Sequence, residues 1–102
     1  MNLQQRPAKN DDIAFRDIED EVFAVAPHSG KYYAFNGVGS YIWQLIDGAN
    51  SVAKIVTKVT EKYEVAPEVA HEEVVNFIAK LESRGLVSLN ERTDVNEPGI
   101  KI

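Results

Sequence analysis

The hydrophobic residues in the first third of the chain are gathered in short runs that are rich in β-branched and aromatic side chains. Residues 13–18 read IAFRDI, residues 22–25 read VFAV and residues 31–35 read KYYAF. Such runs are typical of short strands. An acidic turn at 19–21 and a turn at 27–30 that contains Pro and Gly separate them. Because both connections are short, we predict a small antiparallel meander of three strands.

The rest of the chain changes to apolar residues spaced three and four apart, which is the helical period. Asn36 is expected to cap a first helix that ends at Asp47 and Gly48, and Ser51 a second that continues to about residue 63. A third helix is predicted over residues 67–84. It has Pro and glutamates early and Lys and Arg late, with a Gly following, as helix termini prefer.

Three strands followed by three helices indicate an α+β domain. With a last extended segment over residues 86–89, the parts are those of a winged helix-turn-helix. We expect the domain to span residues 12–89. Residues 1–11 are expected to be a flexible N-terminal segment and residues 90–102 a flexible C-terminal tail, because both are polar and lack periodicity.

Composition narrows the class of function. The chain has 102 residues, a formal net charge of -5 and no cysteine. The negative charge disfavours nucleic acid, because phosphate binding depends on Lys and Arg. The absence of cysteine excludes disulfides and thiolate metal sites. No long apolar run predicts a membrane segment, so we expect a cytoplasmic protein.

Catalytic and metal-binding patterns are missing. The two histidines, His28 and His71, stand alone without a second ligand at a metal-binding spacing. No nucleophile elbow or triad pattern surrounds the serines, and Gly37-Val-Gly39 is too short for a phosphate loop. We therefore expect no catalytic residue, no metal and no cofactor, and predict that the chain is not an enzyme.

A recognition surface is the remaining prediction. Tyr32, Tyr33 and Phe35 lie on the last strand of a small sheet, whose unpaired edge can recruit an extended peptide. Phe77 lies to one side of the apolar face of the third helix and extends this surface. The alternative is that these aromatic residues are core, as we expect for Phe35 and one of the tyrosines.

Four elements, in order, resemble PqqD-like proteins. Residues 30–36 (GKYYAFN) resemble that family's G-x-Y-x-x-L-N, and residues 38–48 (VGSYIWQLIDG) include a segment that resembles its I-W-x-L-L-D-G. Residues 73–81 (EVVNFIAKL) resemble D-V-x-x-F-L-x-x-L, and residues 84–87 (RGLV) resemble R-G-L-L/V. Phe35 replaces the usual leucine and Glu73 the usual aspartate. The resemblance covers most of residues 12–89.

The resemblance implies a recognition element for precursor peptides. Such a domain binds the leader of a ribosomally made peptide, which adds as a strand antiparallel to the third strand, beside the third helix. The partners implied are the leader and a modifying enzyme, such as a radical SAM protein or a leader peptidase. Carried over by position, the peptide-binding residues are Lys31, Tyr32, Tyr33, Ala34 and Phe35 on the strand, and Glu73, Val74, Phe77, Ile78 and Leu81 on the helix.

The N-terminal part lacks the R-L-R-W-E-like pattern associated with pyrroloquinoline quinone synthesis. A binder of a lasso-type or radical-SAM-modified precursor is therefore at least as strong an expectation. Two other classes remain open. They are an adaptor subunit that binds an unrelated protein and, against the acidic charge, a winged-helix regulator that binds DNA. Either a monomer or a homodimer that pairs exposed sheet edges is compatible with the sequence.

Overall fold

Three strands form the antiparallel sheet that the sequence predicts. In the computed structural model, which describes residues 1–26 and 29–90, they are β2 (Ala14–Ile18), β3 (Glu21–Ala26) and β4 (Lys31–Asn36), in the order β2-β3-β4. The predicted turn at 27–30 lies partly outside the described residues.

The sheet buries one face. Alternate residues of β3, Val22 and Ala24, are at most 1% exposed, and they lie opposite Phe35 and Tyr33 of β4. Side chains of residues paired across strands point to the same face of a sheet. The half-buried Tyr33 and Phe35 therefore share the core-facing side of the sheet.

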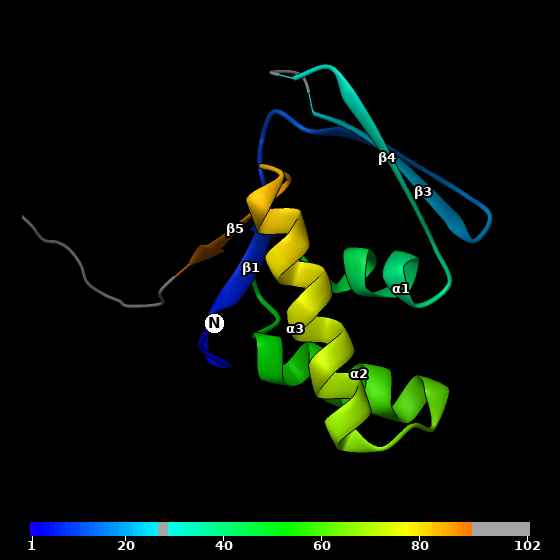
Figure 1. The fold of residues 1–102 in the computed structure, drawn as a ribbon, viewed down its shortest axis with the longest axis vertical. Helices are drawn as coiled ribbons and strands as arrows, with labels where there is room; N and C mark the ends of the chain where they lie inside the picture. Colours follow the sequence, from blue (N-terminus) through cyan, green and yellow to red (C-terminus); the bar gives the residue numbers. More distant parts are fainter. Residues whose placement is uncertain (27–28, 91–102) are drawn as a thin grey trace, which may run out of the picture.

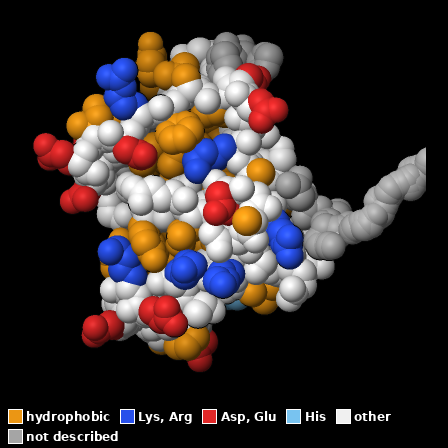
Figure 2. All heavy atoms as spheres, turned by 180° about the vertical axis from the view of Figure 1, so that it is seen from behind, with side chains coloured by type: hydrophobic (Ala, Val, Ile, Leu, Met, Phe, Trp, Pro, Cys, Tyr) orange, Lys and Arg blue, Asp and Glu red, His pale blue; other side chains and the backbone are white. Residues whose placement is uncertain are grey.

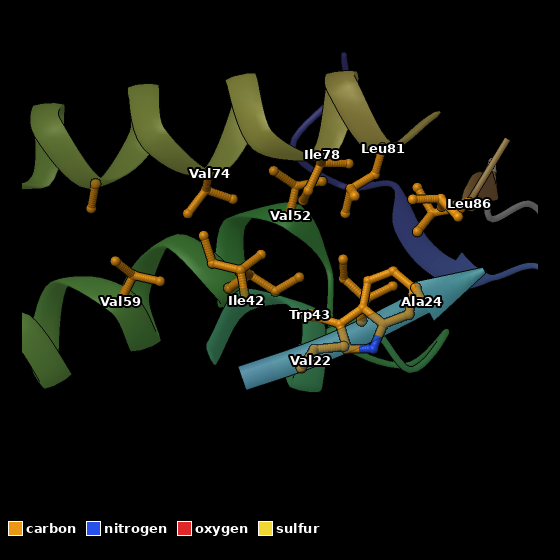
Figure 3. Packing of buried hydrophobic residues seen from close by; sticks show 14 of the residues in the cluster. Val22, Ala24, Ile42, Trp43, Val52, Val59, Val74, Ile78, Leu81 and Leu86 are labelled. Carbon is orange, nitrogen blue, oxygen red and sulfur yellow. The ribbon is translucent and has the colours of Figure 1, made fainter. Parts of the chain in front are cut away.

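Three helices follow: α1 (Val38–Leu45), α2 (Val52–Tyr63) and α3 (Pro67–Ser83). Their apolar side chains meet the buried face of the sheet in one core. Figure 3 shows side chains of α3 pointing toward those of α1 and α2, with Trp43 beside Val22 and Ala24 of β3. The predicted α+β fold, a winged helix-turn-helix with three strands followed by three helices, is confirmed.

Of the two helix caps predicted from the sequence, the structure confirms one and contradicts the other. The Ser51 hydroxyl accepts the backbone N–H of Lys54 at 3.1 Å, which is the predicted cap of α2. The predicted Asn36 cap of α1 is wrong. Gly37 is the N-cap, at φ 57°, and α1 has no side-chain cap. A positive φ costs glycine little, so the chain turns here by backbone conformation instead of by a capping side chain.

A second, two-stranded sheet joins the two ends of the described chain. β1 (Arg6–Lys9) pairs antiparallel with β5 (Val87–Asn90), and α3 lies between this pair and the three-stranded sheet (Figure 1). The sequence predicted β5 to within a residue at each end but did not predict β1. Residues 91–102 of the predicted tail lie outside the described residues.

The N-terminal segment is held to the start of α2. Backbone N–H groups of Gly48, Val52 and Ala53 donate to the carbonyls of Pro7, Gln5 and Leu3 at 2.9–3.0 Å. The side chain of Pro7 is fully buried. The structure therefore gives residues 1–11 a strand and long-range hydrogen bonds, neither of which the sequence predicted.

The side chain of Lys9, the last residue of β1, contacts residues of α1 and β2 and the residue that follows α1. Its amine donates to the Ile46 carbonyl at 2.7 Å and lies 5.0 Å from the ring centroid of Trp43 and 5.2 Å from that of Phe15. Burial lowers the pKa of Lys9, and the negative charges of Asp17 and Asp47 partly oppose this shift. Cation-π contacts supply part of the solvation that the amine loses.

Asp47 fixes the turn between α1 and α2. Its Oδ1 accepts the backbone N–H groups of Ala49 and Asn50, both at 2.9 Å, and these bonds lower the pKa of its carboxyl group. The folded state thus favours the ionised form. At pH 7 we expect Asp47→Ala to lower the free energy of unfolding by about 1 kcal/mol, because two N–H groups lose their acceptor. Urea denaturation measures this change.

Asp47→Asn is the matched control, because its amide oxygen keeps an acceptor without a charge. A carboxyl whose pKa is lowered on folding stabilises the protein above its unfolded pKa, and this contribution is lost as the pH falls through the folded value. We therefore expect the advantage of wild type over Asp47→Asn to shrink below about pH 4. An advantage that stays constant from pH 7 to pH 3 would contradict this account.

Candidate functional site

The free edge of β4 is the first part of the candidate site. β4 pairs with β3 along one edge, and no other strand among residues 1–26 and 29–90 pairs with its second edge. In any strand, alternate residues direct their N–H and C=O groups to the same edge. This edge therefore presents backbone donors and acceptors to an incoming extended chain.

A stripe along α3 is the second part. Glu73, Phe77 and Lys80 lie on α3, and Arg84 is its C-cap residue. They follow one another at spacings of four, three and four residues, which places them on one side of the helix. Phe77 is half-buried and the three charged residues are exposed.

Phe77 joins α3 to β4. Its ring contacts the ring of Phe35 edge-on, with the centroids 5.3 Å apart, and Phe35 in turn contacts Trp43 at 5.3 Å. Gly39 in α1 lies against the same ring, since a Cβ there would be 3.4 Å from it, at the short end of ordinary van der Waals contact. Phe77 is therefore held in a defined place while part of its ring remains accessible.

A second contact joins the two elements further along. The Arg84 guanidinium lies 5.5 Å from the ring centroid of Tyr33. We call the surface formed by Tyr33, Phe35, Phe77 and Arg84, together with the free edge of β4, the β4–α3 seam. It is aromatic at its centre and bordered by charged groups of α3.

The ten predicted site residues separate into three groups. Tyr33, Phe35 and Phe77 come together in the seam, and the exposed Lys31 and Glu73 lie on β4 and α3, the two elements that border it. Tyr32 and Ala34 belong to the opposite face of the sheet, where Tyr32 is 82% exposed. Val74, Ile78 and Leu81 are at most 2% exposed and lie in the core. These three residues pack in the core and have almost no surface exposed to a ligand in this conformation.

Two residues of the seam and its border were not among those predicted. Lys80 and Arg84 were interpreted only as favourable charges near the C-terminus of a helix. The signal for a further role was present in the sequence, since both continue the spacing that Glu73 and Phe77 begin.

Other surfaces differ from the seam. A separate hollow of about 560 Å³ lies between α1 and the end of α2, beside Tyr41, Lys62 and Tyr63, and contains none of the predicted residues. Seen from behind, the molecule shows hydrophobic side chains interspersed with charges of both signs (Figure 2). None of the helices in the described ranges has the length and apolarity needed to cross a membrane.

Solved structures with this architecture provide the first comparison. The structure of TbiB1 in complex with the TbiA(beta) leader peptide has a TM-score of 0.74 and 25% sequence identity, and the match covers 85% of this chain and 99% of that one. A lasso peptide synthetase B1 complexed with its leader peptide gives a TM-score of 0.73 at 19% identity, covering 81% of this chain and 98% of the other.

A third structure is the PqqD truncation of Methylobacterium extorquens PqqCD, a stand-alone recognition element for ribosomally synthesised and post-translationally modified peptides. It gives a TM-score of 0.65 at 18% identity, and the match covers 80% of this chain and 87% of the other. At the identities of these last two structures the likeness establishes the fold.

Sequence comparisons establish the family. No curated protein matches the chain. The family model of coenzyme PQQ synthesis protein D matches residues 21–87, which include the whole of β3, β4 and the three helices. The resemblance found in the sequence motifs is thus confirmed, and the chain belongs to the PqqD family.

Proposed function

We propose that this protein binds the leader segment of a ribosomally synthesised precursor peptide and presents the peptide to a modifying enzyme. The leader adds as a strand along the free edge of β4, antiparallel to it. Membership of the PqqD family supports this proposal, as does the similarity to TbiB1, whose structure holds a leader peptide.

The observation that carries the proposal is the position of Phe77 beside an unpaired strand edge. An added strand gains its backbone hydrogen bonds from β4, and alternate side chains of that strand then lie over Phe77 and Tyr33. Backbone pairing supplies affinity independent of sequence, and the contacts with these rings supply the register.

The role involves binding without a covalent step. The leader must be released once the enzyme has acted, so moderate affinity suits the function better than tight affinity. The buried Val74, Ile78 and Leu81 anchor α3 in the core and act on binding through the position of the helix.

An amide NMR titration tests the proposal. The labelled protein is titrated with synthetic leaders of the short precursor peptides encoded beside its gene. We expect chemical-shift changes to cluster on residues 31–36 and on the exposed side of α3, and amide exchange to slow at alternate residues of β4. The reason is that a new ladder of hydrogen bonds protects only the amides that point to the free edge.

N-methylated leaders provide the control. Methyl groups on the alternate peptide nitrogens that face β4 should abolish binding, whereas methyl groups on the intervening nitrogens should be tolerated. If both methylated series bind equally, strand addition is wrong. A spectrum unchanged by every leader would instead favour the adaptor function.

A further inference from the structure

We infer that the β4–α3 seam selects leaders by the order of their charges, with basic residues before the apolar recognition segment and acidic residues after it. The inference rests on the proposed function, because it assumes that a strand adds antiparallel to β4. It concerns the chemistry of the peptide, which the fold alone leaves open.

The two contacts across the seam fix the relative direction of β4 and α3. Tyr33 of β4 contacts Arg84. Phe35, two residues after Tyr33, contacts Phe77, which lies seven residues before Arg84. The two elements therefore run in opposite directions along the seam. A peptide antiparallel to β4 runs in the same direction as α3, from the Glu73 end to the Arg84 end.

The charges along the seam are segregated. Glu73 stands on the N-terminal half of α3, with Glu72 on the same turn, and Lys80 and Arg84 stand beyond Phe77. Lys31 begins β4 two residues before Tyr33, on the same face of the strand. Among the described residues, none of Glu73, Lys80 and Arg84 forms a salt bridge within the protein.

The basic end is unexpected in an acidic protein. A net charge of -5 would by itself repel acidic peptides along their whole length. Lys80 lies on α3 between Phe77 and Arg84, and Lys31 lies two residues before Tyr33 in β4, so both belong to the Arg84 end of the seam. Stacking on Tyr33 holds the guanidinium of Arg84 beside the path of the strand. A guanidinium that is already positioned loses less conformational entropy when it pairs with a carboxylate.

The bound segment follows from these positions. Read from its N-terminus, it has a basic residue near Glu73, an apolar residue over Phe77, a second apolar residue two positions later opposite Tyr33, and an acidic residue near Arg84 and Lys80. Successive recognised residues are two apart, because alternate side chains of a strand share one face.

Peptides of equal composition test the inference. Two phage-displayed heptapeptides, KTLTFTE and its charge-reversed counterpart ETLTFTK, are selected on the immobilised full chain at low salt. We expect wild type to retain the first about tenfold better, since two exposed ion pairs replace two like-charge contacts. The preference should decrease at high salt.

A charge-reversed protein provides the matched comparison. The exposed pair Glu73→Lys and Arg84→Glu should invert the preference without changing the net charge, and circular dichroism checks that the variant is folded. Inversion supports the inference. The inference is overturned if wild type shows no preference between the peptides or prefers ETLTFTK, or if the variant keeps the wild-type preference. In each case leader binding itself stands, provided that the Phe77→Asp protein no longer retains the peptides. Retention that does not depend on Phe77 for either peptide overturns both the inference and the proposed function.

Discussion

Replacing Phe77 by alanine is expected to weaken leader binding roughly tenfold to a hundredfold, as is typical of a central aromatic anchor. Phe77 holds an accessible aromatic surface beside the free edge of β4, and its ring packs edge-on against Phe35. Alanine removes that surface and leaves the hydrogen-bonding edge without its neighbouring apolar contact. Isothermal titration calorimetry with the leader that gives NMR shifts measures the change.

Val69→Ala is the matched control for this substitution. Val69 is 49% exposed and lies in the first turn of the same helix, eight residues before Phe77. Its truncation should leave leader affinity within about twofold, as for most surface contacts outside a hot spot. Similar losses in the two variants would show that the helix as a whole, and not the seam, responds to truncation. An unchanged affinity in a folded Phe77→Ala protein would remove the seam from the site.

Most of the fold could be predicted from the sequence because its signals are local. The β-branched and aromatic runs in residues 13–35 and the helical spacing after residue 37 are signals carried by neighbouring residues. Ser51 and Gly85 mark helix ends by their own conformational preferences. The structure agrees with the sequence at these places because local propensity and tertiary packing favour the same conformation.

The strand β1 could not be predicted, because its stability comes from distant residues. Arg6–Lys9 has no alternating pattern of its own, and it becomes a strand by pairing with Val87–Asn90 at the other end of the domain. The Asn36 cap failed for a related reason. Asn36 ends β4, paired with Glu21, and the helix begins one residue later than a cap there would require.

The structure brings only some of the predicted site residues together, and their role in binding stays a prediction. Family motifs pointed to β4 and α3, yet the spacing of residues in such motifs follows from core packing as well as from contacts with a ligand. This is why Val74, Ile78 and Leu81 proved to be buried. Arg84 was missed because its contact with Tyr33 joins residues 51 positions apart in the sequence, and only the folded chain brings them together.

Trp43→Ala is expected to lower the free energy of unfolding by about 3–5 kcal/mol, the range for truncating a large buried aromatic residue. Trp43 is 0% exposed and contacts the rings of Phe15 and Phe35 at 5.4 and 5.3 Å. Because a small domain is stable by only about 5–15 kcal/mol, this single change removes much of its stability. Urea denaturation followed by circular dichroism measures the loss.

Trp43→Phe separates the shape of this side chain from its hydrogen-bonding group. The indole Nε1 is buried, and no described residue accepts a hydrogen bond from it, so we expect the loss of this N–H to cost little. Phenylalanine leaves a cavity but removes that donor, and we expect a loss of only about 1–2 kcal/mol. It also keeps a ring against Phe35, so leader binding should survive in Trp43→Phe and fail in Trp43→Ala. Equal losses of stability in the two variants would contradict this account. They would mean that the indole N–H forms a hydrogen bond in solution and that Trp43 stabilises the fold by more than the volume it fills.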